Sequence, residues 1–172
     1  MTQQLLVRTE AGVPLVEHLW STLHIGGTID ADLGPRLADH TFPPSARSRP
    51  IRSMTFDVTV DQGFRYAGAS GDRIGHSIDD EIARSEGYPG KLVQGMCSFA
   101  MCSGAVVAIA GGDPARLRRL AGRFARPLFP NQQLVVECYD GGRTDDGLQI
   151  VVFEAQAGGE TVIRHGWAEL AT

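Results

Sequence analysis

An acid, an imidazole and a hydroxyl stand within one short stretch of this chain. Residues 70–79 read SGDRIGHSID, which places Asp72, His76 and Ser77 a few positions apart. A carboxylate and an imidazole that share one water molecule can exchange protons with it, which is general acid–base chemistry. The two glycines of the stretch let the backbone approach a ligand at little steric cost. We therefore interpret residues 70–79 as a candidate catalytic loop.

Each of these side chains also has a structural interpretation. Asp72 is either the acid of a site or a residue that caps its own turn through the carboxylate. His76 is either catalytic or a partly buried structural histidine. Ser77 can donate a hydrogen bond to a substrate or water, but no neighbouring base would make it a nucleophile. Tyr66, just before the loop, belongs to the core or to the site, and the sequence leaves these alternatives open.

A long apolar segment follows the loop. Residues 95–110 read GMCSFAMCSGAVVAIA and end at a glycine pair. The segment is too short and too rich in small residues to cross a membrane, so we predict a helix that is buried on all sides. Cys97 and Cys102 lie in it and are interpreted as small core residues. With Cys138 they make an odd number without a C-x-x-C pair, which favours reduced thiols in a cytosolic protein.

The bulk composition is that of an ordinary globular domain. The chain has 172 residues, of which 42% are hydrophobic and 21% charged, enough to build one core. A net charge of −4 gives no reason to expect a nucleic acid or an anionic membrane as a partner. No leader-like segment is present, so we expect a cytoplasmic protein.

The other segments predict an antiparallel sheet against the apolar helix. The first 52 residues are interpreted as a β-hairpin, within 5–25, and an irregular connector that is rich in Gly and Pro, from 26 onward. Residues 53–172 form the main domain. Its strands are predicted at 56–60, 116–126, 133–139, 148–155 and 161–170, and its helices at 61–69, 79–85 and 95–110. A helix that covers one face of a sheet is an α+β architecture.

Arginines recur on one side of the strand predicted at 116–126. Arg119 and Arg123 share a face there, opposite Leu120 and Phe124. We interpret this arginine face as solvated, with phosphate binding as the alternative.

Four blocks in order resemble one known family. Residues 66–72 (YAGASGD) lead into a match to the motif S-G-D-x-N-P-x-H-x-D. Residues 87–96 (GYPGKLVQGM) resemble G-F-x-x-P-I-x-H-G-M, residues 123–130 (RFARPLFP) resemble R-F-x-x-P-x-F-P-G, and the closing strands also fit. From about residue 56 to 170 the chain therefore resembles the MaoC-like dehydratases and (R)-specific enoyl-thioester hydratases, which have the hotdog fold. The first 26 residues resemble the last strand pair of a preceding hotdog unit.

The resemblance implies a fold, a reaction and a set of site residues. The fold is an antiparallel sheet wrapped around one long helix, and the reaction is addition or loss of water across a 2,3-double bond conjugated to a thioester. Asp72 matches the family acid, and Gly95 matches the residue whose N–H stabilises the thioester oxygen. Tyr66, Gln94 and Ser77 are expected to line the substrate site. No cofactor or metal is implied.

The sequence departs from the family pattern at the histidines. Ser77 occupies the position of the catalytic histidine, and His76 lies one residue earlier. Ile74 replaces the family asparagine, and Gln94 replaces the histidine before Gly95. A one-residue offset in an extended segment turns a side chain to the opposite side, but a glycine before His76 leaves a local rearrangement open.

Three functions remain after this departure. The first is an enoyl-thioester hydratase or dehydratase with a rearranged Asp/His pair. The second is a hotdog enzyme that cyclises or isomerises an acyl or polyketide-type chain without water addition. The third is a non-catalytic acyl-binding or assembly subunit. The expected partners are an acyl thioester of coenzyme A or of an acyl carrier protein, and a second copy of the chain in a homodimer.

Overall fold

The computed structural model describes residues 2–22, 26–28 and 40–172. They belong to two compact units, Met1–Ala38 and Asp39–Thr172. The division lies earlier than the boundary at 52 that the sequence suggested, because residues from 42 onward already pack on the sheet of the second unit.

The first unit contains the predicted hairpin. Strands β1 (Thr2–Arg8) and β2 (Pro14–Ser21) pair antiparallel, with Gly12 in the left-handed region at φ 81° in the turn. Every residue of both strands is exposed in this structure. Residues 23–25 of the predicted hairpin lie outside the described ranges.

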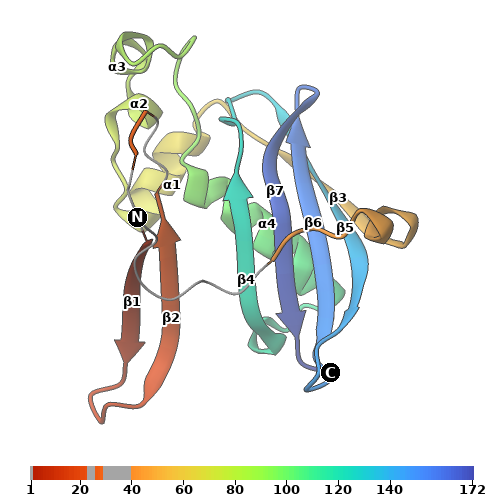
Figure 1. Ribbon diagram of the computed structural model, residues 1–172. Helices are drawn as coiled ribbons and strands as arrows, with labels where there is room; N and C mark the ends of the chain where they lie inside the picture. The colour runs from red at the N-terminus through yellow and green to blue at the C-terminus, as the bar shows by residue number, and fades with distance from the viewer. Residues whose placement is uncertain (1, 23–25, 29–39) are drawn as a thin grey trace. The chain divides into compact units, whose positions relative to one another are not determined.

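The second unit is built on a five-stranded antiparallel sheet in the order β3-β5-β6-β7-β4 (Figure 1). Its strands are β3 (Pro50–Asp57), β4 (Leu117–Phe124), β5 (Gln133–Arg143), β6 (Gln149–Ala157) and β7 (Glu160–Leu170). The sheet and the helix that packs on it confirm the α+β hotdog prediction. The two edges of the sheet are β3 and β4.

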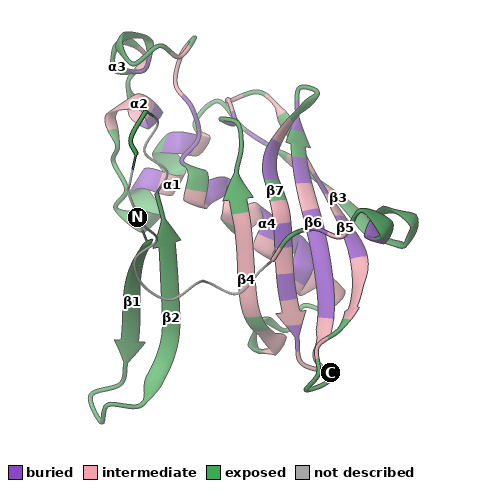
Figure 2. Ribbon diagram, in the orientation of Figure 1, coloured by how far each residue is buried: buried purple, intermediate pink, exposed green. Residues whose placement is uncertain are grey.

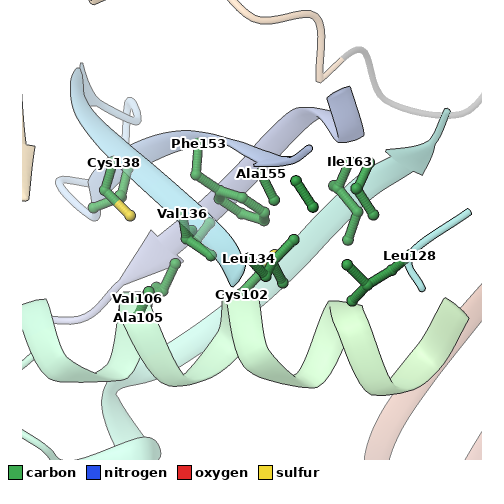
Figure 3. Close-up of a cluster of buried hydrophobic side chains, with 14 of the residues drawn as sticks. Cys102, Ala105, Val106, Leu128, Leu134, Val136, Cys138, Phe153, Ala155 and Ile163 are labelled. Atoms are coloured by element: carbon green, nitrogen blue, oxygen red, sulfur yellow. The ribbon is translucent and has the colours of Figure 1, made fainter. Parts of the chain in front are cut away.

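Helix α4 (Gly95–Ile109) packs along the inner face of the sheet. Cys102, Ala105 and Val106 are fully buried against sheet residues such as Phe153 and Ile163 (Figure 3). The helix is not buried on all sides as predicted, because one five-stranded sheet covers only one side of it (Figure 2). Its outer side carries the exposed residues Ala100 and Gly104, and Gly95 is exposed at the start of the helix.

The outer face of the sheet has a smaller core of its own. The short helix η1 (Pro44–Ser48) places Ala46 and the preceding Phe42 against Tyr139 and Val152. The sequence had predicted an irregular connector here. The prolines suggested a loop, but Pro50 opens edge strand β3, where a missing N–H removes no bond from the sheet interior.

The segment between β3 and α4 carries the candidate site on three short helices. These are α1 (Gln62–Ser70), α2 (Gly75–Ile78) and α3 (Asp80–Ser85). Helices α1 and α3 were predicted, whereas α2 lies within the stretch interpreted as a loop. Asp79 caps α3 by accepting the N–H groups of Glu81 and Ile82.

The remaining short helix, η2 (Pro114–Arg116), follows α4. All three cysteines are buried and unpaired, in agreement with their interpretation as core residues. Within the described ranges, no helix is long and apolar enough to cross a membrane.

Candidate functional site

The turn that follows α1 holds Asp72. Gly71 ends the helix in the left-handed region at φ 79°. Ser70 Oγ donates to the Tyr66 carbonyl at 2.8 Å and accepts the Asp72 N–H at 3.1 Å. Asp72 Oδ1 accepts the N–H of Ile74 at 3.3 Å, and the residue is exposed. The carboxylate therefore makes the turn contact, and it also remains accessible to a ligand.

Gln94 connects this turn to the start of α4. Its side chain is buried, and Nε2 donates to the carbonyls of Gly63 and Asp72, each at 3.1 Å. The amide thus holds three segments together: α1, the Asp72 turn and the first residue of α4. Gln94 Oε1 is buried without a hydrogen-bond partner among the described residues. A buried oxygen in that condition is free to accept from a water or a ligand.

Ser77, in the position of the family histidine, is also buried. It is 2% exposed, and its Oγ finds no hydrogen-bond partner in the described part of the chain. The Ser77 carbonyl lies so close to Gly63 that a Cβ on that residue would collide with it. Helix α2 is therefore packed tightly onto α1, and Ser77 points a hydroxyl, not a base, into buried space.

His76 points to a different set of partners. Its Nδ1 lies 2.7 Å from Glu86 Oε2, and its ring packs edge-on against Tyr88 with centroids 5.8 Å apart. Among the described residues, the imidazole contacts Glu86 and Tyr88 and does not contact Asp72. Nothing in the sequence marked Glu86 as its partner, because the pair forms across the end of α3.

The start of α4 has the features of an oxyanion-binding site. The first N–H groups of a helix have no partner within the helix, and the helix dipole makes this end positive. Gly95 is exposed, and a Cβ there would lie 3.2 Å from the ring of Phe124. Val93, just before the helix, is anchored by its N–H to the Leu128 carbonyl at 2.8 Å. The helix end can thus accept a carbonyl oxygen beside an aromatic wall.

Tyr66 lies half-buried between α1 and the core. Burial raises the pKa of its hydroxyl, and negative charge on Cys97 or Asp72 would raise it further. Burial also raises the pKa of the Cys97 thiol, which accepts a weak hydrogen bond from Gln62 Nε2 at 3.5 Å. Both groups are therefore neutral at pH 7, and Tyr66 is a hydrogen-bond donor rather than a base.

Sequence reasoning also missed an ion pair on the far side of α2. Lys91 Nζ lies 2.7 Å from Asp80 Oδ2, and its N–H donates to Asp80 Oδ1. A shallow surface groove of about 540 Å³ is lined by residues at the start of β5 and the end of β6, and none of the candidate residues lines it. Within the described ranges, no group of three or more His, Cys, Asp or Glu residues is placed to hold a metal ion.

Comparisons with known proteins identify the family of the fold. The family model described as the MaoC like domain matches residues 43–163. The chain is 26% identical over 180 residues to a probable dehydratase, NIT22, of Ajellomyces capsulatus, covering 98% of this chain and 47% of that protein. It is 31% identical over 153 residues to 3-hydroxyacyl-thioester dehydratase Y of Mycobacterium tuberculosis, covering 87% of this chain and 50% of that protein.

Among solved structures, a MaoC-like dehydratase from Phytophthora Capsici superposes with a TM-score of 0.88 at 25% identity. The match covers 99% of this chain and 58% of that one. The chain thus spans about half the length of these relatives.

Proposed function

This chain belongs to the MaoC-like domain family, and we propose that it binds an acyl thioester at the start of α4 and acts on it with the carboxylate of Asp72. The thioester oxygen would accept from the N–H of Gly95, where it gains from the helix dipole as negative charge develops. The carrier of the acyl group is coenzyme A or a carrier protein. The relatives are dehydratases, so the parent reaction is hydration or dehydration of the acyl chain.

One observation carries the proposal. Gln94 Nε2 bonds the Asp72 carbonyl while its own backbone leads directly into α4. The acid and the oxyanion-binding end are therefore held together by one buried side chain.

The arrangement also favours a second reaction. Water addition needs a base and an acid on one water molecule, and His76 is paired with Glu86 at 2.7 Å. A single carboxylate suffices for isomerisation: Asp72 removes a proton from C4 of a 2-enoyl thioester, the dienolate oxygen is held at α4, and the protonated Asp72, which exchanges its proton with solvent, gives a proton to C2. We therefore propose that water addition is slow and that double-bond migration competes with it.

The test is to incubate the protein with crotonyl and longer 2-enoyl thioesters in D₂O. Product analysis by NMR separates 3-hydroxyacyl products from 3-enoyl products, and deuterium at C2 or C4 reports proton transfer. Asp72→Asn is the control for both reactions. Hydration as the main product supports the hydratase function, and 3-enoyl product supports the isomerase. Thioester binding without either product would make the chain an acyl-binding subunit and overturn the proposal.

A further inference from the structure

Two arginines face each other on strands β4 and β7, and the described residues offer them no counter-ion. Arg123 pairs directly with Arg164 in the register of the ladder, and both are exposed. Like charges directly opposite one another destabilise a sheet. On the same ladder, Arg119 pairs with Glu169 and forms an ion pair at 3.0 Å. Neither Arg123 nor Arg164 has a carboxylate partner among the described residues.

A strained histidine stands beside this pair. His165 has a φ of 52°, in the left-handed region that non-glycine residues seldom occupy. Its Nδ1 accepts the N–H of Phe42 at 3.2 Å, which leaves Nε2 as the donor of the neutral ring. Burial, and then the charges of Arg164 and Arg123, lower the pKa of His165, so the neutral ring is the form present at pH 7. A strained residue next to uncompensated charge is a reason to look for a ligand.

Glu154, the carboxylate that acts on His165, is engaged with another arginine. Glu154 raises the pKa of His165, but its effect is the smallest of those that shift this pKa. Both of its oxygens are taken by Arg47 Nη2, at 2.7 and 2.9 Å, and Arg47 in turn stacks over the Phe42 ring at 4.6 Å. Within the part of the chain that the structure describes, Arg123 and Arg164 therefore keep two uncompensated positive charges beside one N–H donor.

We propose that Arg123, Arg164 and His165 form a phosphate-binding site on the outer face of the sheet. Two guanidinium groups and a neutral imidazole donor match the charge and the acceptor oxygens of a phosphate monoester. Phosphate binding itself is independent of the proposed function. The source of the phosphate rests on that function: it is the nucleotide end of a coenzyme A thioester.

Edge strand β4 connects this site to the acyl site. Phe124 follows Arg123 and lies against Gly95 at the start of α4. Neighbouring residues of a strand point to opposite faces about 3.3 Å apart along the chain. Since β4 is an edge of the sheet, a pantetheine arm that leaves the α4 end can pass around this edge to reach the phosphate site.

Phosphate binding is tested first without any substrate. Inorganic phosphate is titrated into the wild type, the double variant Arg123→Gln/Arg164→Gln and the control Arg118→Gln, at ionic strength matched with potassium chloride. Arg118 is exposed on the same strand as Arg123. At a rise of about 3.3 Å per residue, it lies about 16 Å from Arg123. We expect saturable binding that weakens at least tenfold in the double variant and less than twofold in the control. Equal weakening in the control, or no saturation in the wild type, overturns the site.

Thermal unfolding checks that the variant is intact. In phosphate-free buffer the double variant should melt at the same temperature as the wild type or higher, since a repulsive pair has been removed. Added phosphate should raise the melting temperature of the wild type but not that of the double variant. A phosphate-induced rise of equal size in both proteins contradicts the assignment.

The source of the phosphate is tested with adenosine 3′,5′-bisphosphate and with two substrates. For a coenzyme A thioester, KM should rise about tenfold in the double variant, while kcat and KM for the matching pantetheine thioester stay unchanged. If phosphate binding is lost but both KM values stay the same, the site takes free phosphate and the assignment to coenzyme A is wrong. If neither thioester is turned over by the wild type, the proposed function fails, and the phosphate titration still decides this site.

Discussion

Asp72, His76 and Ser77 have separate environments although they lie close together in the chain. Asp72 is exposed in a turn, His76 pairs with Glu86, and Ser77 is buried with an unpartnered hydroxyl. The acid–base pair expected from the family pattern is thus represented by its acid alone. Two substitutions at this scale separate a catalytic role from a structural one.

Asp72→Asn should reduce turnover by roughly 100-fold or more, because loss of a proton-transfer group has about that effect. The asparagine retains an oxygen for the Ile74 N–H, so the melting temperature should stay close to that of the wild type. Steady-state kinetics and thermal unfolding of the same preparation provide the measurement. Turnover equal to the wild type would mean that the carboxylate only caps its turn.

His76→Ala should have the opposite profile. We expect turnover to change far less than the roughly 100-fold that accompanies loss of an acid–base group, because the imidazole is engaged with Glu86 and Tyr88. Stability should fall by about 0.2–1 kcal/mol, as for other partly exposed pairs. Glu86→Gln, which removes the same pair from the other side, should behave alike. A collapse of turnover in His76→Ala alone would show that the ring acts on the substrate.

At the scale of elements, α4 and strand β7 each contain one conformational feature on which a proposed site depends. The α4 end is open because it begins with glycine beside the Phe124 ring. In β7, His165 itself has left-handed backbone angles, and its Nδ1 accepts the N–H of Phe42. Both features are tested by changes that leave the hydrophobic core intact.

Gly95→Ala should lower turnover at least tenfold. The added methyl would lie 3.2 Å from the Phe124 ring, beside the N–H that we propose receives the thioester oxygen, and removing one oxyanion donor costs about 10²–10³ in kcat. Gly68→Ala, at an exposed position of α1, is the matched control, since a Cβ there would meet no atom of the described residues within 4 Å. That variant should keep full activity and gain up to about 1 kcal/mol of stability. Equal activity in both variants would exclude the helix end from the site.

The lowered pKa of His165 predicts how stability depends on pH. The unfolded chain takes up a proton near the ordinary value of 6.5, whereas the folded chain does so only at lower pH. The free energy of unfolding should therefore be constant above about pH 7 and decrease as the pH falls below 6.5. Urea unfolding between pH 5 and 8 measures it, with His165→Asn as the variant in which this dependence should flatten. An unchanged slope in His165→Asn would assign the effect to other groups.

At the scale of the whole molecule, the exposed surfaces bear on whether a second subunit binds. The outer side of α4 is exposed at Ala100 and Gly104, and Asp72 and Gly95 lie on the surface. In the separate hairpin unit, apolar side chains are exposed on both strands, and a two-stranded hairpin alone is marginally stable in water. A second hotdog unit would cover such surfaces and enclose the site.

We therefore expect a homodimer in solution. Light scattering at micromolar concentration should report twice the mass of the chain, which is 18.5 kDa. Ala100→Glu on the outer side of α4 should shift the protein toward monomer, because a charge in a closed interface must be desolvated. Ala69→Glu, at an exposed alanine of α1, should leave the mass unchanged. A monomeric wild type would contradict the expectation.

Local sequence patterns were sufficient for most of the elements. Alternating residues predicted the four strands after α4, and the apolar run from Gly95 predicted that helix, because these periodicities reflect one face turned toward a core. The ordered motif blocks identified the family, since they describe turns and a helix start whose backbone geometry depends on neighbouring residues. Prolines around β3 misled the prediction, because their effect depends on whether a strand lies at an edge.

The partners of the site residues were decided only by tertiary structure. The pairing of His76 with Glu86, the two bonds from Gln94, and the meeting of Arg123 with Arg164 join segments that are separated in the chain. A side chain chooses its partner by direction and distance in space, and a one-residue offset is enough to reverse its direction. The sequence by itself therefore determined which chemical groups this protein carries and on which fold, whereas the packing of α1, α2 and α4 decided which of those groups can act together.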